Sequence, residues 1–388
     1  MTIKLLEELM TNATRAHHVF APTIAAAIAI LAAVLIAFTI MPTRAYAVVD
    51  APSNSGALAV KGGNLVSAKT GKPVVLRGVS THGLAWYPQY VNNSCFNTLR
   101  YDWNVNCIRL AMYTAEIGYC DGYSKKKLEK RVANGVKYAT ANDMYVIIDW
   151  HILSDGNPNT YLKQAKKFFT KMAKKYRKKN NVIFEICNEP NGRGTWKNIK
   201  KYAKKIIPII RKKAKNSIIL VGTPAWCTRV DKAASSPLPK RYRKNVMYTA
   251  HFYANSHQEL ARRLVAKAKR KKAPVFVSEY GISSDTGNHG VNVEQADLWM
   301  ELLNKYNISS CAWSLCNKNE SSAFIKPGYK KAYGFSYSNL TASGRWLYDM
   351  LKNAYADPSS ADSSTTEDDM APSNDPEDGS NPVFTPAG

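Results

Sequence analysis

The sequence predicts an α/β protein built as a single (β/α)8 barrel. Eight short β-rich apolar runs can be marked, and their starts are separated by 29 to 39 residues. Amphipathic helical patterns lie between most of these runs, and no GxGxxG or GxxxxGK[ST] motif follows any of them. Strands that alternate with helices form right-handed parallel crossovers. Eight such units in about 300 residues fit a closed barrel better than an open nucleotide-binding sheet.

The predicted elements can be given in chain order. The strands are expected at Pro73–Val79, Val105–Met112, Met144–Trp150, Val182–Asn188, Ser217–Gly222, Val246–Phe252, Val275–Glu279 and Ser309–Ser314. The helices are expected at Ser124–Ala141, Tyr161–Lys178, Trp196–Lys213, Ser256–Lys271, Val293–Tyr306 and Ala342–Ala354, where apolar residues recur at steps of three and four.

The two ends of the chain differ from the body in composition. The run Ile24–Met41 is apolar, and the small residues Ala45 and Ala47 follow it. This pattern favours an export signal cut after Ala47, with an uncleaved membrane anchor as the alternative. Both place the protein outside the cytoplasm, secreted or attached to the cell surface. We therefore expect a signal or anchor at 1–47, one catalytic domain at 50–356 and a disordered, acidic Ser/Pro-rich tail at 357–388.

The net charge of +25 is unevenly distributed. Residues 1–47 carry +1 and residues 357–388 carry −8, which leaves +32 on 48–356. The lysine clusters of the body fall on several predicted helices, so they are expected to be solvated outer faces and not one groove for nucleic acid. No nucleic-acid partner is predicted, although weak attraction to anionic wall polymers is compatible with this charge. A membrane partner follows only if the N-terminal segment stays uncleaved, and a monomer is expected.

Cysteine usage gives no metal site. Seven Cys are present, so at least one thiol has no partner within the chain. Cys107 and Cys187 lie inside apolar runs and are expected to be buried thiols. Pairing of Cys95 with Cys120, or of Cys311 with Cys316, stays open. No CxxC pair has metal spacing, and neither a metal nor another cofactor is predicted.

Two carboxylates end predicted strands. Glu189 follows the fourth run and precedes a Pro-Asn-Gly turn, and Glu279 ends the seventh run before Tyr280-Gly281. In a barrel, both strand ends face one cavity. Glycosidic bond cleavage needs such a pair, one neutral acid and one ionised carboxylate. The alternative is that each Glu pairs with a basic neighbour in a polar barrel mouth.

Further polar and aromatic residues lie at the same strand ends. They are His82, Arg109, Tyr113, His151, His251, Tyr253 and Trp313. Aromatic rings stack on the C–H faces of sugars, and polar groups bind the hydroxyls. Two deeper acids are expected to be structural: Asp149 at the third strand end, and Glu185 paired inside the barrel, with Arg77 as the candidate partner.

Three sequence blocks resemble glycoside hydrolase family 5 cellulases of the bacterial endo-β-1,4-glucanase subgroup. They are Ile186-Cys187-Asn188-Glu189-Pro190-Asn191, Ser278-Glu279-Tyr280-Gly281, and the block from Trp313 to Ser322. The resemblance runs from Leu76 to Trp346. One departure is Cys316, at a place where the family more often has Asp or Ser.

The resemblance implies a role for each matching residue. Glu189 would be the acid/base and Glu279 the nucleophile, with Arg109 and Tyr253 in contact with the nucleophile. Asn188 would bind the sugar 2-hydroxyl, and His151 and His251 would complete the same subsite. Stacking would come from Trp86, Trp226 and Trp313, and a polar pair from Lys318 and Glu320.

The predicted function is therefore a retaining endo-acting hydrolase of β-1,4-glucosidic bonds in cellulose and related β-glucans, with a polysaccharide as its partner. Such a mechanism requires the two carboxyl groups to lie about 5 Å apart. Mannanase, xyloglucanase or mixed-linkage glucanase activity on the same scaffold is the alternative specificity. A metal-dependent amidohydrolase would need an H-x-H pair that Ser80-Thr81-His82-Gly83 lacks. The non-enzymatic alternative is a polysaccharide-binding barrel.

Overall fold

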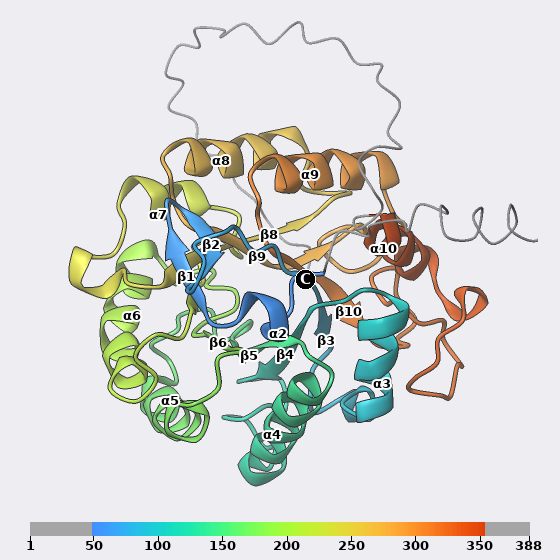
Figure 1. Cartoon of the computed structure of the whole chain (residues 1–388), viewed down its shortest axis with the longest axis horizontal. Helices are drawn as coiled ribbons and strands as arrows, with labels where there is room; N and C mark the ends of the chain where they lie inside the picture. Colours follow the sequence, from blue (N-terminus) through green and yellow to red (C-terminus); the bar gives the residue numbers. More distant parts are fainter. Residues whose placement is uncertain (1–48, 354–388) are drawn as a thin grey trace, which may run out of the picture. The chain divides into compact units, whose positions relative to one another are not determined.

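The barrel is confirmed by a computed structural model, which describes residues 49–353 of the 388-residue chain. Eight parallel strands close in the order β10-β3-β4-β5-β6-β7-β8-β9, and helices surround them (Figure 1). The predicted export signal or anchor at 1–47 and the predicted acidic tail at 357–388 lie outside the described residues and stay predictions.

Each barrel strand falls on or beside a predicted apolar run. The strands are β3 Arg77–Thr81, β4 Cys107–Tyr113, β5 Tyr145–His151, β6 Val182–Glu185, β7 Ile219–Val221, β8 Val246–Tyr253, β9 Val275–Gly281 and β10 Ser310–Leu315. The largest differences concern β3, which begins four residues later than predicted, and β6, which ends three residues earlier. Residues after Glu185 leave the ladder before Pro190, whose ring cannot continue a strand.

The six predicted helices are all present. They are α4 Lys125–Ala141, α5 Leu162–Tyr176, α6 Trp196–Arg211, α8 Glu259–Arg270, α9 Val293–Lys305 and α10 Ala342–Asn353. Ser124 begins α4 as an N-cap, because its hydroxyl accepts the backbone N–H of Lys127. Short helices were not predicted, since they are too brief to show a period. They are α2 Pro52–Ser55, α3 Asn93–Asn97, α7 Val230–Ser235, the π-helical turn Thr98–Asp102, and the 3-10 turns Pro88–Tyr90, Lys240–Tyr242 and Tyr337–Asn339.

A hairpin that was not predicted covers the N-terminal end of the barrel. Strands β1 Leu58–Lys61 and β2 Asn64–Ser67 pair in antiparallel register, and Figure 1 looks onto this end. Leu58 and Leu65 of the hairpin belong to one buried apolar cluster with inward-facing barrel residues such as Ile147 and Phe276. The barrel therefore has a closed apolar floor, and polar groups are confined to the layers above it.

All seven cysteines are free thiols. Cys107 and Cys187 are fully buried, as predicted, and neither pairing that the sequence left open is formed. Cys120 is the one thiol of the seven that is partly exposed. In the stretch 49–353, helices are too short or too polar to cross a bilayer.

Candidate active site

A pocket of about 360 Å³ opens at the C-terminal ends of the barrel strands. Twelve of the fourteen predicted site residues line it, namely His82, Trp86, Tyr113, His151, Glu189, Trp226, His251, Tyr253, Glu279, Trp313, Lys318 and Glu320. The other two, Arg109 and Asn188, are fully buried and contact the lining residues from below. The sequence therefore identified residues that the fold brings into one site.

The two strand-end carboxylates face each other in this pocket. Glu189 lies four residues beyond the end of β6, and Glu279 lies within β9. A carboxylate oxygen of Glu189 and one of Glu279 lie within 4.8 Å of one another. Both residues are buried. This separation is smaller than the roughly 6.5–9.5 Å that leaves room for a water between two carboxyl groups.

A β-bulge in β9 directs Glu279 into the pocket. On the β8 side, Thr249 and His251 are two residues apart, whereas their partners Phe276 and Glu279 are three residues apart. The register of β10 against β9 shifts at the same place. Residues of a regular strand alternate between faces, but a bulge re-aims a side chain. Ser278 and Glu279, although adjacent, consequently both contact groups inside the barrel.

Glu279 is held by one cation and one hydroxyl. Arg109 Nη1 lies 2.9 Å from Glu279 Oε2, and the hydroxyl of Tyr253 donates to Oε1 at 2.8 Å. Each oxygen thus has its own donor. Charge-assisted hydrogen bonds of this kind stabilise a carboxylate in its ionised form and fix its orientation.

Arg109 is the centre of a buried ionic cluster beneath the pocket. Its Nε lies 2.7 Å from Glu185, and its Nη2 lies 3.0 Å from Asp149. The predicted pairing of Glu185 with Arg77 is wrong. Arg77 lies at the first position of β3, near the barrel floor, and donates instead to the carbonyl of Ile308. Arg77 also donates to Asn304 on α9, so it faces out of the barrel, whereas Arg109 faces the interior and reaches Glu185.

A chain of hydrogen bonds determines which atom carries the proton between Glu189 and His251. Ser278 donates its hydroxyl proton to Glu185 at 2.6 Å. It can then only accept from His251 Nε2, which lies 2.9 Å away. In a neutral imidazole the other nitrogen is an acceptor. His251 Nδ1 therefore accepts a proton donated by Glu189 Oε1 at 2.8 Å.

The pKa shifts of these two groups agree with that assignment. The pKa of Glu189 is raised to about 8, mainly by burial; Arg109 opposes this shift, and the nearby Asp149 and Glu185 contribute to it. Burial lowers the pKa of His251 to about 4, so the ring is neutral near pH 7. A buried carboxylic acid beside a neutral acceptor keeps its proton. Glu189 is thus a proton donor at neutral pH.

His151 and Asn188 form a second fixed pair. His151 Nδ1 lies 2.6 Å from Asp149, and its Nε2 lies 3.2 Å from Asn188 Nδ2. Asn188 also donates to the carbonyl of Ile152 and accepts from Arg109. Burial lowers the pKa of His151 well below its usual value. Asp149 thus contacts His151 and Arg109 and does not itself line the pocket.

A family model described as "Cellulase (glycosyl hydrolase family 5)" matches residues 67–319, which is most of the chain. The chain belongs to this family. Endoglucanase A of Butyrivibrio fibrisolvens is 45% identical over 300 residues, which cover 76% of this chain and 68% of that protein. An endoglucanase of Clostridium saccharobutylicum is 44% identical over 319 residues, which cover 82% of this chain and 70% of that protein.

Solved structures of the family have the same fold. The catalytic domain of the Thermobifida fusca endoglucanase Cel5A, in complex with cellotetraose, matches with a TM-score of 0.74 at 35% identity. The match covers 78% of this chain and all of that one. The alkaline cellulase K catalytic domain matches with a TM-score of 0.73 at 34% identity. This match covers 79% of this chain and 96% of that one.

Aromatic rings form one wall of this family 5 site. The ring centroids of Trp86 and Tyr113 are 4.6 Å apart, and those of His151 and Trp313 are 5.4 Å apart with nearly parallel planes. His82 lies among them, 5.1 Å from Trp313. Trp86 is 39% exposed, so its face is accessible to a ligand. Such rings offer flat apolar surfaces beside the carboxylates.

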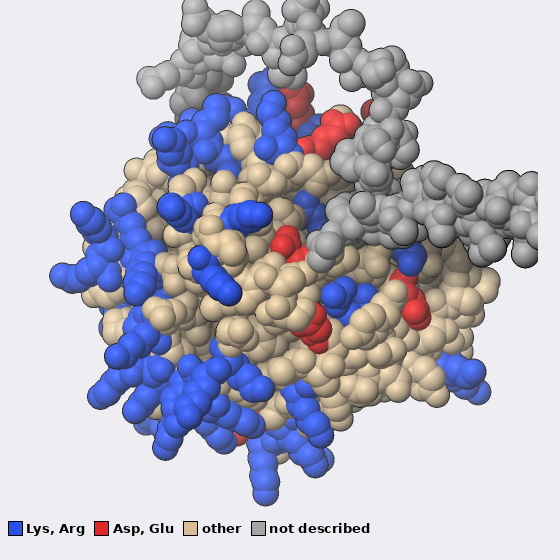
Figure 2. Space-filling model, in the orientation of Figure 1, with Lys and Arg blue, Asp and Glu red and all other residues tan. Residues whose placement is uncertain are grey.

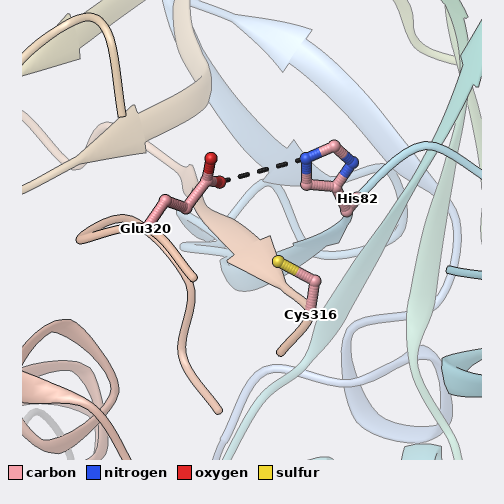
Figure 3. A group of neighbouring side chains, drawn as sticks. All are labelled: His82, Cys316 and Glu320. Atoms are coloured by element: carbon pink, nitrogen blue, oxygen red, sulfur yellow. Dashed lines mark ion pairs between the residues drawn. The ribbon is translucent and has the colours of Figure 1, made fainter. Parts of the chain in front are cut away.

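At the rim of the site, His82, Cys316 and Glu320 lie close together (Figure 3). His82 Nε2 is 3.9 Å from Glu320, which also pairs with Lys318. The backbone N–H of Gly83 donates to His82 Nδ1 at 2.7 Å. The neutral ring therefore carries its proton on Nε2, the atom that would have to bind a metal here. This group therefore does not fit a metal ion, and its polar side chains lie beside the aromatic wall.

Some residues of the site had no predictive signal in the sequence. His257 and Asp285 line the pocket, and Ser278 links His251 to Glu185 beneath it. Ser278 directly precedes Glu279, but only the bulge places it inside. His257 follows the end of β8 by four residues and accepts the backbone N–H of Tyr253, a contact that no motif reveals.

Proposed function

We propose that the protein is a retaining endo-β-1,4-glucanase that cleaves internal bonds of cellulose and related β-glucans. The observation that carries this proposal is the separation of less than 4.8 Å between oxygens of Glu189 and Glu279. Retaining glycosidases need this short separation, because one carboxylate must reach the sugar carbon itself. The endo-glucanase specificity is carried over from the relatives, which are named endoglucanases.

In the first step, Glu279 attacks the anomeric carbon of the sugar. The bond between that carbon and the bridging oxygen breaks, and Glu189 gives its proton to this oxygen. The contacts of Glu279 with Arg109 and Tyr253 hold the nucleophile in a fixed orientation. Glu189 has the required proton because burial raises its pKa to about 8.

In the second step, water releases the sugar from Glu279. Esterified Glu279 carries no negative charge, so it no longer repels the charge of an ionised Glu189. Glu189 then accepts a proton from the attacking water, and the C–O bond to Glu279 breaks. His251 Nδ1, 2.8 Å from Glu189, lies within reach of the same proton throughout the cycle.

The substrate would lie across the pocket with its rings against the aromatic wall. Trp86 and Trp313 supply stacking faces, and Asn188 and His151 supply polar groups next to Glu279. Because a glucan chain is long and insoluble, hydrolysis would take place outside the cell. This agrees with the export signal predicted at residues 1–47. A monomer suffices for this scheme, since both carboxylates come from one chain.

The deciding experiment follows the first anomer released. Soluble cello-oligosaccharides would be hydrolysed in an NMR tube, and proton spectra would be recorded before mutarotation. Retention predicts that the β-anomer appears first, whereas an α-anomer would contradict the short-distance mechanism. Parallel assays on hydroxyethylcellulose, barley β-glucan and mannan would test the glucan specificity, and faster hydrolysis of mannan would reassign the substrate.

Two variants separate the carboxylate roles. Glu279→Gln should lose activity on every substrate, because it lacks the attacking oxygen. Glu189→Gln should still release an acidic phenol from an aryl cellobioside, since that leaving group needs no proton, but it should lose about 10²–10⁴-fold on glucan. Circular dichroism would show whether each variant is folded. Equal losses on both substrates for Glu189→Gln would argue against its role as the acid.

A further inference from the structure

The helices α5 and α6 carry cations without compensating acids. Residues 162–179 contain nine Lys and Arg, residues 196–215 contain another nine, and neither segment contains an Asp or Glu. The two helices are neighbours around the barrel, and Figure 2 shows Lys and Arg gathered over them. We call these two segments the basic face. In the described part of the chain, Lys171 alone among these eighteen pairs with a carboxylate, that of Glu129.

Local structure does not account for this charge. Cations favour the last turn of a helix, where they offset the negative end of its dipole. Here they run from Lys163 in the first turn of α5 to Lys179 beyond its end, and α6 repeats the pattern. Crowded like charges destabilise a compact fold. The catalytic scheme does not use them either, because the pocket with Glu189 and Glu279 opens at the strand C-termini.

A second hollow, of about 310 Å³, lies where the basic face meets the N-terminal end of the barrel. Five cations line it: Arg177, Lys178, Lys179, Lys213 and Lys215. Asn180, Asn216 and Ser217 add amide and hydroxyl groups, and the lining contains no carboxylate side chain. Its volume is at the lower end of the range of small-ligand sites, about 300–1,000 Å³.

We propose that this hollow and the basic face bind a carboxylated polysaccharide, with one uronate ring in the hollow and neighbouring rings along α5 and α6. A uronate ring offers one carboxylate for the lysines and several hydroxyls for the amides. The enzyme would thereby be held on an acidic glycan matrix. The catalytic pocket lies at the opposite end of the barrel and stays free for a neutral glucan.

The composition of the face favours a glycan over a membrane or a nucleic acid. Of the exposed large apolar side chains in residues 49–353, none lies on α5 or α6. The face therefore has no apolar anchor for lipid and no exposed ring for base stacking. Sixteen of its eighteen cations are Lys. Lys acts as a point charge, whereas the Arg fork is favoured where phosphate is bound bidentately.

Binding of the full-length protein to soluble polygalacturonate, measured calorimetrically in low salt, tests the proposal. The test variant combines Lys178→Gln, Lys179→Gln, Lys213→Gln and Lys215→Gln. The matched control combines Lys305→Gln, Lys330→Gln, Lys331→Gln and Lys352→Gln, all exposed and outside the basic face. The test variant should bind about tenfold more weakly or worse, with a shallower salt dependence, and the control within about twofold of wild type. Equal losses in both variants, or no loss in either, would overturn the proposed site.

Two further binding measurements test whether the basic face binds a membrane or the acidic segment 357–388 instead of a glycan. Vesicles containing phosphatidylglycerol should bind more weakly than polygalacturonate, and tighter binding to them would overturn the assignment to a glycan. Replacing the eight acidic residues of 357–388 by Asn and Gln should leave the affinity within about twofold. A gain of about tenfold in affinity for polygalacturonate would assign the basic face to that segment of the chain itself.

These measurements record binding, so they do not depend on the catalytic proposal. Unchanged hydrolysis of hydroxyethylcellulose would show that both lysine variants are folded.

Discussion

His251 Nδ1 lies 2.8 Å from Glu189 Oε1 and accepts a hydrogen bond from it. The direction of this bond depends on Ser278 and Glu185. Because the Ser278 hydroxyl donates its hydrogen bond to Glu185, it can only accept from His251, so His251 Nε2 carries the proton. A neutral histidine in this state favours the protonated form of Glu189. In the proposed mechanism, the protonation of the acid thus depends on a serine that does not line the pocket.

Activity should fall as the pH rises through about 8. Burial raises the pKa of Glu189 to about 8, so the neutral acid is present below this pH and is lost above it. The group needed in the first step is the protonated one, and the alkaline limb of kcat/KM reports its loss in the free enzyme. A pH profile on a neutral cello-oligosaccharide measures it.

Ser278→Ala should move that alkaline limb to lower pH. Without the hydroxyl, His251 can carry its proton on Nδ1 and donate to Glu189, which stabilises the ionised carboxylate. The matched control is Ser278→Thr, which keeps the hydroxyl and should leave the limb within about half a pH unit of wild type. A limb that stays in place in Ser278→Ala would show that the serine does not set the direction of the bond.

Trp86→Ala should raise KM about tenfold with little change in kcat. Trp86 is 39% exposed at the pocket and packs on Tyr113, so its loss removes a stacking surface without disturbing the carboxylates. Stacking of one ring is worth on the order of 1 kcal/mol or more. Tyr101→Ala removes an even more exposed aromatic side chain that does not line the pocket and should change neither constant. A fall in kcat alone would contradict a role in binding.

Arg109→Met should destabilise the fold as well as abolish activity. The substitution removes the cation between Glu185, Asp149 and Glu279 and leaves buried carboxylates unpaired. Breaking a buried ion pair in this way costs about 3–5 kcal/mol, which urea unfolding would detect. Arg131→Met on α4, where the guanidinium binds the carbonyl of Leu84, is the matched control and should cost much less. Equal costs would mean that the ionic cluster does not stabilise the barrel.

Thiol titration should find seven reactive groups after denaturation and, in the native protein, slow reaction beginning at Cys120. All seven thiols are free, and six of them are buried. Burial raises the pKa of Cys120 to about 12, so even this partly exposed thiol is a weak nucleophile near pH 8. Reductant should leave the melting temperature unchanged. A count below seven in denaturant without reductant would reveal a disulfide.

The barrel and its main residues could be predicted because they depend on local sequence. Apolar runs about 35 residues apart predict the strands, and Glu189 and Glu279 follow or end such runs. The position of a residue at a strand end is enough to place it at the mouth of a closed barrel.

Contacts that depend on register could not be predicted. The bulge in β9 turns Ser278 and Glu279 to the same side, although alternation places neighbours on opposite faces. Likewise, Glu185 pairs with Arg109 and not with Arg77, because Arg77 points out of the barrel and donates to Asn304 on α9. The hairpin Leu58–Ser67 was missed because its four-residue strands carry too few apolar positions to show alternation.

The sealed apolar end of the barrel has a kinetic consequence. Since Leu58 and Leu65 of the hairpin pack against the inward-facing residues there, nothing can pass through the middle of the molecule. An intact glucan and both of its cut halves must therefore use the same entrance. Short oligosaccharides that accumulate during digestion share that entrance with fresh polymer, so we expect any inhibition by products to be competitive.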